Sequence, residues 1–324
     1  MTNISMINAA AERLRGHARV TPMLSSPFLD EIAGRRVLVK AECLQHTGSF
    51  KFRGGWSAVS ALDPAARARG VIAFSSGNHA QGVALAAARH DAPAVIVMPA
   101  DAPAMKIANT RAFGAEVVLY DRLNESREDI GAALAEDRGL TLIRPYDEPL
   151  VIAGQGTCGL EIAEQAGAMG VTDADVLVCC GGGGLTGGIA LALADRAPGL
   201  RARPTEPEGF DDVARSLASG AIQTNNRAGG SLCDAIVTPA PGRITFPIMA
   251  AHCGPGLVVS DAECLRAMAL AFARLKIVVE PGGAAALAAA LFHPDACDGD
   301  DVIVVATGGN VDPEIFVRAL GTLT

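Results

Sequence analysis

One lysine stands out by its place in the sequence. Lys51 lies in the stretch 44–54, after the strand-like run 37–42 and before the helix-like segment 55–62. At the start of a helix, backbone N–H groups and the helix dipole raise the local positive potential, and this favours the neutral amine over the ammonium. A neutral lysine amine attacks aldehydes, so Lys51 is a candidate Schiff-base former. An ordinary solvated lysine at a helix start is the alternative.

A second candidate is the loop 75–79, between a strand-like run and a helix. Its residues are Ser75, Ser76, Gly77, Asn78 and His79. Small residues with free N–H groups at a helix start form a pocket for an anion such as the carboxylate of an amino acid. Asn78 can also donate to a phenolate oxygen. The alternative is a capping turn in which Ser76 or Asn78 satisfies the helix end.

A third candidate is a run of four glycines. Gly181, Gly182, Gly183 and Gly184 follow an apolar run and precede a helix expected at 189–196. Glycine lets the backbone approach a ligand closely, and successive N–H groups can surround a phosphate. The run has neither the acidic ribose partner of a dinucleotide site nor the Lys-Ser/Thr pair of a P-loop. It therefore predicts a phosphate site of another kind, with a purely structural glycine turn as the alternative.

Together these stretches resemble one family. The sequence Ser-Phe-Lys-Phe-Arg-Gly at 49–54 is similar to the cofactor-lysine motif of the serine/threonine dehydratase and serine racemase family, which are pyridoxal-phosphate enzymes of fold type II. The resemblance extends over nearly the whole chain. It implies an α/β fold like that of the tryptophan synthase β subunit, with two domains that each hold a mainly parallel sheet flanked by helices.

The resemblance also implies roles for single residues. Lys51 would hold pyridoxal 5′-phosphate, Asn78 would contact its 3′-oxygen, and Thr307 would hydrogen-bond its pyridine nitrogen. A hydroxyl partner cannot keep that nitrogen protonated, which favours expulsion of a β-substituent over transamination. The expected cofactor-binding residues are Phe50, Lys51, Asn78, Gly181, Gly182, Gly183, Gly184, Leu185 and Thr307. The expected substrate-binding residues are Ser75, Ser76, Gly77, Asn78, His79 and Ser231.

The activity implied is the removal of water and ammonia from L-threonine or L-serine, with Lys51 as the general base. The close alternatives are a serine or other amino-acid racemase and a 3-hydroxyaspartate dehydratase. Racemase-like members have a serine at the position of Ser76, which would act as the second catalytic acid. A pyridoxal-phosphate-binding protein without turnover is a more distant alternative. Because the chain ends soon after Thr307, we expect no regulatory domain like that of biosynthetic threonine dehydratases.

The stretch 205–212 is a candidate cation site. Glu206 and Asp212 could supply carboxylate oxygens, and Phe210 its carbonyl, to a hard cation. Racemase-like members hold a divalent cation at the matching positions, so the resemblance implies Mg²⁺ or another divalent cation here. An acidic solvated loop is the alternative. Pro204 departs from the apolar strand expected before Glu206, because proline interrupts a strand ladder.

The elements that must position these residues alternate along the chain. Strands are predicted at 71–74, 94–98 and 116–120, with helices at 80–90, 104–113 and 125–138. This order is typical of βαβ units and a parallel sheet. We predict a small substrate-loop domain at 70–147, inserted into a large cofactor-binding domain of residues 1–69 and 148–324. Further along, we predict helices at 154–169, 260–274 and 283–292, and strands at 175–180 and 302–306.

The composition disfavours some classes of molecule as binding partners of this protein. The chain has 324 residues, half of them apolar, and a formal net charge of −8, which disfavours nucleic acid and anionic membranes. Its eight cysteines form no CxxC pair or metal-ligand pattern, so we expect reduced thiols. The N-terminus lacks the pattern of a signal peptide, and no apolar run reaches membrane-spanning length. We therefore expect a cytoplasmic enzyme acting on a small amino acid, and the resemblance implies a homodimer.

Overall fold

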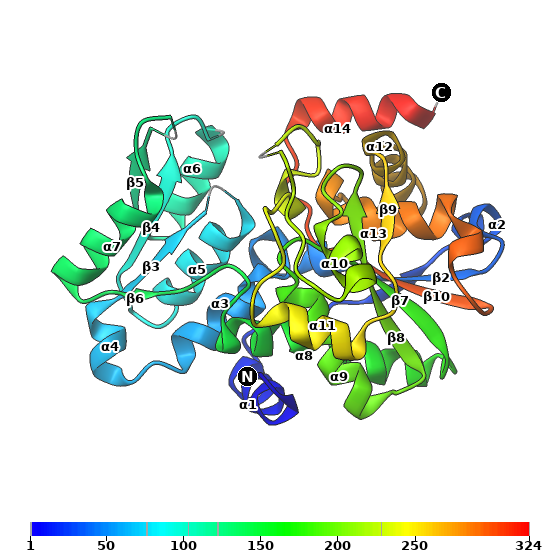
Figure 1. Ribbon diagram of the computed structural model, residues 1–324, viewed down its shortest axis with the longest axis horizontal. Helices are drawn as coiled ribbons and strands as arrows, with labels where there is room; N and C mark the ends of the chain where they lie inside the picture. The colour runs from blue at the N-terminus through cyan, green and yellow to red at the C-terminus, as the bar shows by residue number, and fades with distance from the viewer. Residues whose placement is uncertain (1, 76, 103, 122, 228, 324) are drawn as a thin grey trace.

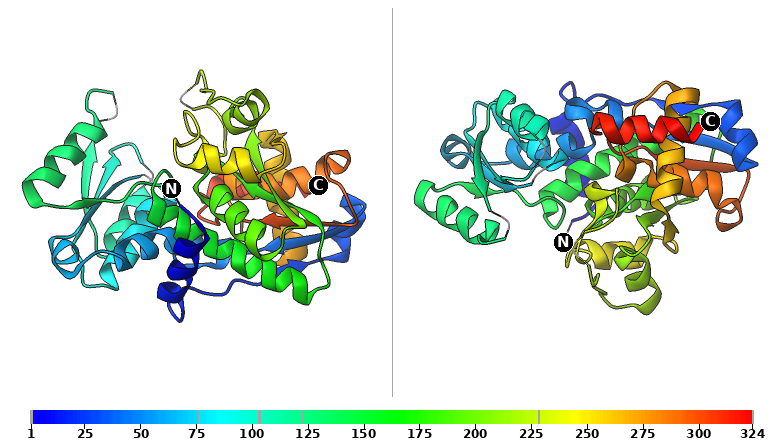
Figure 2. Two further views of the ribbon diagram at one scale, coloured as in Figure 1. Left: turned by 60° about the horizontal axis from the view of Figure 1, so that its bottom comes forward. Right: turned by 90° about the horizontal axis from the view of Figure 1, so that it is seen from above.

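The molecule consists of two lobes that lie side by side (Figure 1). The computed structural model describes residues 2–75, 77–102, 104–121, 123–227 and 229–323. Each lobe is built on its own sheet, and the two additional views show the same two lobes (Figure 2). The expected class, α/β with two mainly parallel sheets flanked by helices, is confirmed.

The helices and strands alternate over most of the chain. The helices are α1 (Ile4–Leu14), α2 (Pro27–Ala33), α3 (Lys51–Ser60), α4 (Pro64–Arg69), α5 (Asn78–Ala88), α6 (Ala104–Ala112), α7 (Arg127–Arg138), α8 (Pro149–Ala168), α9 (Gly184–Arg196), α10 (Asp212–Ser219), α11 (Thr245–His252), α12 (Asp261–Leu270), α13 (Pro281–Phe292) and α14 (Pro313–Leu320). The strands are β1 (Met23–Ser25), β2 (Arg36–Lys40), β3 (Val71–Phe74), β4 (Ala94–Pro99), β5 (Glu116–Tyr120), β6 (Thr141–Leu142), β7 (Ala174–Cys179), β8 (Leu200–Pro207), β9 (Leu257–Val259) and β10 (Asp301–Val305).

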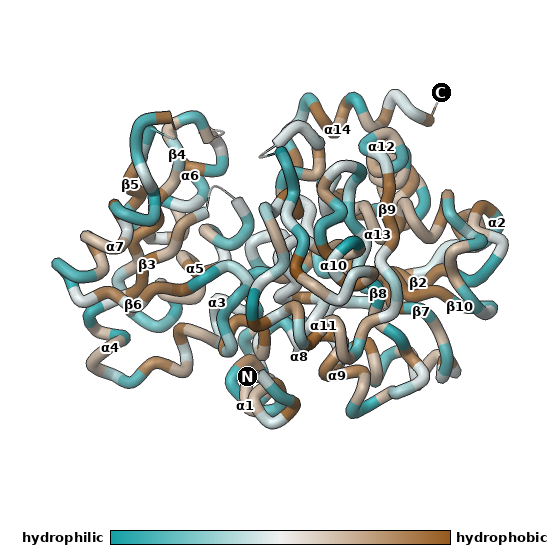
Figure 3. Tube along the Cα trace, in the orientation of Figure 1, coloured by the Kyte–Doolittle hydropathy of each residue, from teal (hydrophilic) through white to brown (hydrophobic). Residues whose placement is uncertain are grey.

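The larger sheet has the order β1-β2-β10-β7-β8-β9, and only β1 runs antiparallel to its neighbour. Its central strand β10 is buried on both faces. Val302 and Val304 pack into a core with α2, α12 and α13, whereas Ile303 and Val305 pack into a second core with α8 and α9. Side chains alternate between the faces of a strand, so a strand that is apolar throughout needs helices on both sides. The central strands are hydrophobic along most of their length (Figure 3).

The smaller sheet has the order β5-β4-β3-β6 and is parallel throughout. One face packs against α5, on which α3 packs in turn, and the other face packs against α7. Helix α3 belongs to the predicted large domain because it precedes residue 70, but it packs on α5 of the predicted small domain. The predicted limits of the two domains, 1–69 with 148–324 and 70–147, stay a prediction.

The predicted strands 71–74 and 116–120 match β3 and β5, and the other predicted elements lie within a few residues of the observed ones. Pro204 does not interrupt the strand before Glu206, because β8 continues through this residue and pairs with β7 on one side. The other neighbour, β9, pairs only with residues 205–207 of β8. Pro204 therefore lies where one side of the strand has no ladder to interrupt. The strands β1, β6, β8 and β9 and the helices α2, α4, α10, α11 and α14 were not predicted.

Within the described part of the chain, we find no helix that combines the length and apolar character needed to cross a bilayer. The eight cysteines are all free thiols, as expected, and all but Cys253 are buried.

Candidate active site

The loop 75–79, the glycine run and Thr307 each follow a strand at its carboxyl end. The loop 75–79 follows β3, the glycine run follows β7 and Thr307 follows β10. Lys51 is the first residue of α3. Ligands of parallel α/β sheets bind at this end of the strands. The structure brings the motifs together around one cavity of about 630 Å³. The sequence-predicted residues that line it are Phe50, Lys51, Ser75, Gly77, Asn78, His79, Gly181, Gly182, Gly183, Gly184, Leu185 and Thr307.

The amine of Lys51 lies between the two lobes. Its Nζ donates to the backbone carbonyl of Pro145 at 2.8 Å and lies 5.2 Å from the centre of the Phe50 ring. Burial lowers the pKa of Lys51 to about 8, and the nearby carboxyl of Glu280 opposes this shift. This lowering of the pKa has the direction expected for Lys51, but its main cause is burial and not the position at the start of a helix.

The chain has four lysines, and their surroundings differ. Lys40 is fully buried and its ammonium contacts Glu161, with 2.5 Å between Nζ and Oε2. Lys276 is exposed. Only Lys51 and Lys106 line the cavity. Since Lys40 is paired with a carboxylate and Lys51 contacts only a neutral carbonyl, Lys51 is the better placed to supply a free amine.

The loop 75–79 does not act as a capping turn at Asn78. The N-cap of α5 is Gly77, and Asn78 instead contacts Glu280 and Asn310 through its side-chain amide. Ser75 accepts a hydrogen bond from the Gly77 N–H at 3.2 Å. Ser76, the expected second acid of a racemase, lies outside the described residues.

The imidazole of His79 is buried and uncharged. Burial, followed by the charge of Lys51, lowers the pKa of His79 to about 3. Its Nε2 lies 2.9 Å from the carbonyl of Ile143, and Nδ1 is a buried atom without a hydrogen-bond partner among the described residues. With Nε2 donating to the carbonyl, Nδ1 is left as an acceptor. Because a buried acceptor without a partner costs free energy, a ligand with a hydrogen-bond donor at this position would be favoured.

The glycine run forms a cradle that no side chain could enter. Gly183 is the N-cap of α9 with φ 88°, a conformation that favours glycine. A Cβ atom on Gly182 would collide with the ring of Tyr146, and one on Gly183 would collide with the end of Met249. The first turn of α9 has N–H groups without intrahelical partners, and the helix dipole favours an anion there. These features fit a phosphate group.

Thr307 and Glu280 face the cavity from the larger lobe, and both side chains are only 4% exposed. Glu280 immediately precedes α13, and its Oε1 accepts a hydrogen bond from Asn78 Nδ2 at 2.6 Å. Burial raises the pKa of the Glu280 carboxyl to about 7. Glu280 is therefore a direct partner of Asn78 at the edge of the cavity.

Two further cavity segments were not identified from the sequence. The segment 144–147 carries the carbonyl that contacts Lys51, and its Asp147 accepts hydrogen bonds from the backbone N–H groups of Arg243 and Ile244. The second segment, 234–243, includes Thr238, whose buried hydroxyl has no partner among the described residues. Apart from a 3₁₀ turn at Asp234–Ile236 both are irregular, so no period of apolar residues marks them; only their prolines and Gly242 signal turns.

Ser231 does not lie with the other predicted substrate residues. Its hydroxyl donates to Asp261 at 2.6 Å, and it is not among the residues that line the cavity. Thr238, further along the chain, has a buried hydroxyl without a partner among the described residues. The assignment of Ser231 as a substrate contact is therefore not carried into the function proposed below.

The candidate cation residues lie apart from the cavity lining. Glu206 accepts hydrogen bonds from the N–H groups of Val213 and Ala214 at 2.9 and 2.7 Å, and Asp212 Oδ1 accepts from Asn225 at 2.5 Å. Asp212 Oδ2 is buried without a partner among the described residues. Burial raises the pKa of Asp212 to about 6, and burial together with the Asp212 charge raises that of Glu206 well above its usual range.

A cation fits this pair of acids, because it would satisfy the orphaned oxygen and neutralise two buried carboxylates. Phe210 is buried beside them and could add its carbonyl, as predicted. In the described ranges, no group of three or more His, Cys, Asp or Glu side chains is arranged to hold a metal. Further ligands would have to be backbone carbonyls or water.

A lysine amine and a glycine run that line one cavity, beside two mainly parallel sheets, fit an enzyme that uses an aldehyde-bearing phosphate cofactor. Residues 14–308 match the model of a family described as pyridoxal-phosphate dependent enzyme. The chain belongs to this family, within the serine/threonine dehydratase and serine racemase group of fold type II.

Several relatives cover almost the whole chain. An L-threo-3-hydroxyaspartate ammonia-lyase from Pseudomonas sp. is 47% identical over 311 residues, which are 96% of each chain. A serine racemase from Schizosaccharomyces pombe is 40% identical over 97% of this chain and 96% of its own. The structure of a threonine deaminase from T.th. is similar with a TM-score of 0.90 and 44% identity, covering 96% of this chain and 99% of that one.

Proposed function

We propose that this protein is an ammonia-lyase that converts L-threo-3-hydroxyaspartate into oxaloacetate and ammonia. A pyridoxal-phosphate-dependent ammonia-lyase is the coarser activity that the family supports. The finer proposal rests on a cationic side chain in the cavity, Lys106, in addition to Lys51. It is supported by the similarity to two proteins named L-threo-3-hydroxyaspartate ammonia-lyase, one from Pseudomonas sp. and one from Saccharomyces cerevisiae at 43% identity.

Each part of the site has a task in this reaction. When bound, pyridoxal phosphate supplies an aldehyde for the substrate amine and a ring that withdraws electrons from the α-carbon. The glycine run with Leu185 would hold its phosphate, and Thr307 is the candidate partner of its ring nitrogen. The neutral amine of Lys51 takes the proton from the α-carbon of the substrate. The loop 75–79 binds the α-carboxylate, with the free hydroxyl of Thr238 as a further candidate contact.

The second carboxylate of hydroxyaspartate needs a cation of its own, and Lys106 is placed to supply it. Lys106 lies in the first turn of α6, which begins after β4, and β4 is the neighbour of β3, whose end carries the loop 75–79. Its side chain is 14% exposed, and its only ion pair in the described chain is a 3.4 Å contact to the largely exposed Asp234. A substrate carboxylate could replace that weak partner.

Replacing Lys106 with methionine is expected to lower kcat/KM for L-threo-3-hydroxyaspartate about 10- to 100-fold, because a hydrogen bond to a charged group contributes about 1.5–3 kcal/mol. The same variant should change kcat/KM for L-serine and L-threonine by less than about threefold, since these lack the second carboxylate. Steady-state assays of the 2-oxo acid products measure both. Arg111→Gln, on the exposed part of the same helix, is the control for loss of one positive charge.

Equal losses for all three substrates would mean that Lys106 supports the fold of the cavity and not the second carboxylate. An unchanged value for hydroxyaspartate would also contradict the assignment. The wild-type comparison tests the function itself: if L-threonine or L-serine has the higher kcat/KM, the proposed substrate is wrong.

Dehydration of L-threonine and L-serine, the activity first expected, is the second candidate, and the similarity to a threonine deaminase supports it. Racemisation is the third, supported by the serine racemase from Schizosaccharomyces pombe. Chiral chromatography after incubation with L-serine separates the two, because only racemisation yields D-serine. The cytoplasmic location and homodimeric state of the protein stay predictions.

We further propose that Glu206, Asp212 and the carbonyl of Phe210 bind Mg²⁺ or another divalent cation. Added Mg²⁺ is expected to raise the melting temperature by a few degrees at concentrations well above its Kd, because a ligand of the folded state stabilises it by mass action. Asp212→Asn should remove this response while the variant still folds, since the amide keeps the shape of the side chain. Thermal scans with Mg²⁺ and with chelator measure it. If neither Mg²⁺ nor chelator changes the melting temperature of the wild-type protein, the proposed cation site is wrong.

A further inference from the structure

The side chain of Asn78 is held by two other side chains. Its Nδ2 donates to Glu280 Oε1 at 2.6 Å, and its Oδ1 accepts a hydrogen bond from Asn310 Nδ2 at 2.6 Å. Asn310 Nδ2 also donates to the backbone carbonyl of Thr47 at 2.8 Å. The chain of contacts therefore joins three of the segments that carry the predicted motifs: the one before Lys51, the loop 75–79 and the loop after β10.

This arrangement fixes which way the amide of Asn78 faces. A backbone carbonyl can only accept, so Asn310 must turn its Nδ2 toward Thr47. The second N–H of the same nitrogen then donates to Asn78, which must present its oxygen to Asn310. The Nδ2 of Asn78 consequently lies on the side of Glu280. It has two hydrogens and gives one to Glu280, so one N–H remains for a ligand in the cavity that Asn78 lines.

Asn310 is itself fixed to the backbone that leads into Lys51. Thr47 has φ 60° and ψ 14°, a left-handed conformation that is unfavourable for a β-branched residue. The N–H of Gly309 donates to the carbonyl of Gly48 at 2.9 Å, and Ser49 forms an isolated bridge with Gly308. The position of Asn310, and with it the orientation of Asn78, is therefore tied to the turn that precedes Lys51.

We propose that Asn310 is a positioning residue. It keeps the amide of Asn78 turned so that the remaining N–H of Asn78 can donate to the phenolate oxygen of bound pyridoxal phosphate. The inference rests on the cofactor contact of Asn78 expected from the family, and it adds what orients that contact. It gives a function to Asn310, which lies in the same loop after β10 as Thr307.

Asn310→Asp tests this orientation, because aspartate has nearly the same shape but its carboxylate only accepts. In this variant the Nδ2 of Asn78 would have to turn toward the new carboxylate at position 310. The Oδ1 of Asn78 would then face Glu280 and the cavity. Losing a donor to the phenolate raises the pKa of that oxygen. We expect the pH midpoint of the visible absorbance of bound pyridoxal phosphate to rise by about one unit, and the affinity of the apoenzyme for the cofactor to fall about tenfold.

A double-mutant cycle with Asn78→Ala separates positioning from general damage to the fold. If Asn310 acts through Asn78, the substitution Asn310→Asp should shift the absorbance midpoint in the wild-type background and leave it nearly unchanged in the Asn78→Ala background. Equal shifts in both backgrounds would overturn the inference. So would a midpoint that does not respond to Asn310→Asp in a variant whose melting temperature shows that it is folded.

Two further variants keep the test decisive. Asn310→Ala removes the donor without adding a charge and enters the same cycle if Asn310→Asp does not fold. Asn8→Asp, on α1, adds one carboxylate far from these contacts and should leave the midpoint unchanged. If Asn78→Ala alone does not move the midpoint, the cofactor contact of Asn78 is wrong and the inference fails with it. Product formation from hydroxyaspartate is assayed separately and tests the proposed substrate.

Discussion

Replacing Lys51 with alanine is expected to abolish turnover and the visible absorbance of the protein-bound cofactor. Burial lowers the pKa of Lys51 to about 8, so a much larger fraction of its amine is uncharged near neutral pH than in an exposed lysine. Of the three other lysines, Lys40 is paired with Glu161 and Lys276 is exposed. An amine that attacks the aldehyde and later removes the α-proton cannot be replaced by a methyl group. The expected loss is several orders of magnitude in kcat, measured as formation of 2-oxo acid.

Lys106→Met is the matched control, since it removes the only other lysine of the cavity. This variant should keep the absorbance band even where it loses activity on hydroxyaspartate. If the band persists in Lys51→Ala together with product formation, Lys51 is not the cofactor lysine.

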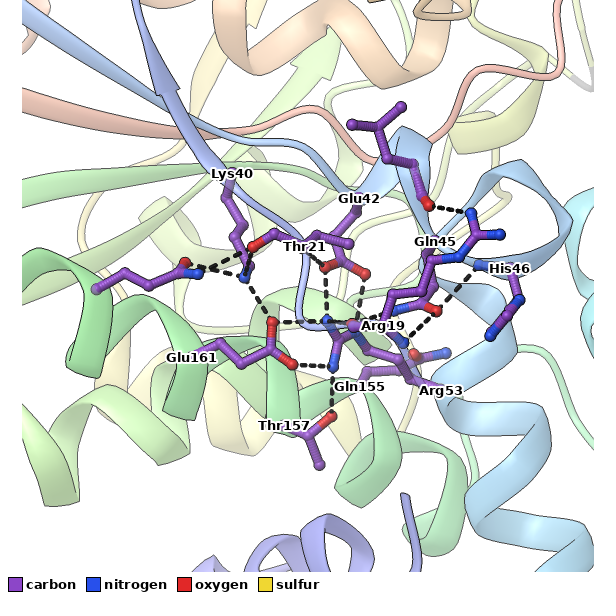
Figure 4. Close-up of polar contacts among 12 residues, drawn as sticks. Arg19, Thr21, Lys40, Glu42, Gln45, His46, Arg53, Gln155, Thr157 and Glu161 are labelled. Atoms are coloured by element: carbon purple, nitrogen blue, oxygen red, sulfur yellow. Dashed lines mark hydrogen bonds and ion pairs between the residues drawn. The ribbon is translucent and has the colours of Figure 1, made fainter. Parts of the chain in front are cut away.

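Arg53→Met is expected to destabilise the apoenzyme by about 3–5 kcal/mol, because it leaves a buried carboxylate without its cation. Arg53 is 1% exposed and contacts Glu42 through Nε and Nη2 at 2.8 and 2.7 Å (Figure 4). Its Nη1 contacts Glu161 at 2.7 Å, and Glu161 also contacts Lys40. The cluster joins the end of β2, the first turn of α3 and the middle of α8, so it fixes the helix that begins with Lys51.

The acid dependence of stability should change with the same substitution. Burial tends to raise the pKa of Glu42, but the Arg53 charge and hydrogen bonds outweigh it, and the pKa is lowered from the usual 4.5. A carboxyl with a lowered pKa contributes stability above the ordinary pKa, and this contribution is lost as the pH falls through the folded-state value. Urea unfolding at several pH values should show this loss in the wild type but not in Arg53→Met.

The double variant Glu42→Gln with Arg53→Met is the control for the charge effect. Removing both charges should restore part of the stability lost in Arg53→Met, because an uncompensated buried charge costs more than a missing pair. A loss below about 1 kcal/mol in Arg53→Met would contradict the account of the cluster.

The parts of the fold that follow simple periodicity were predictable from the sequence. Strands β3 and β5 matched because short apolar runs bounded by turn residues have few alternatives. Strand β8 was not recognised because it contains Arg203 and Pro204, and these are tolerated only through tertiary contacts. Arg203 is buried against Asp175 at 2.7 Å, and Pro204 lies before the stretch that β9 pairs with. Neither contact leaves a local signal in the sequence.

The candidate site was predictable where a motif is continuous. The glycine run and Lys51 could be singled out because each lies at the junction of two regular elements, and both line the same cavity. Lys106 and Thr238 were missed, because a single residue in a helix or loop becomes part of a site only when distant segments meet. Asn78 and Glu280 are 202 positions apart, and no spacing rule predicts their hydrogen bond.

The most direct test of the account is to find which lysine holds the cofactor. Reduction of the holoenzyme with borohydride fixes pyridoxal phosphate to its lysine, and peptide mass spectrometry then locates the label. With only four lysines in the chain, the peptides are readily told apart. The account predicts the label on Lys51 alone. A label on Lys106, Lys40 or Lys276, or an unlabelled protein that still forms the 2-oxo acid, would contradict it.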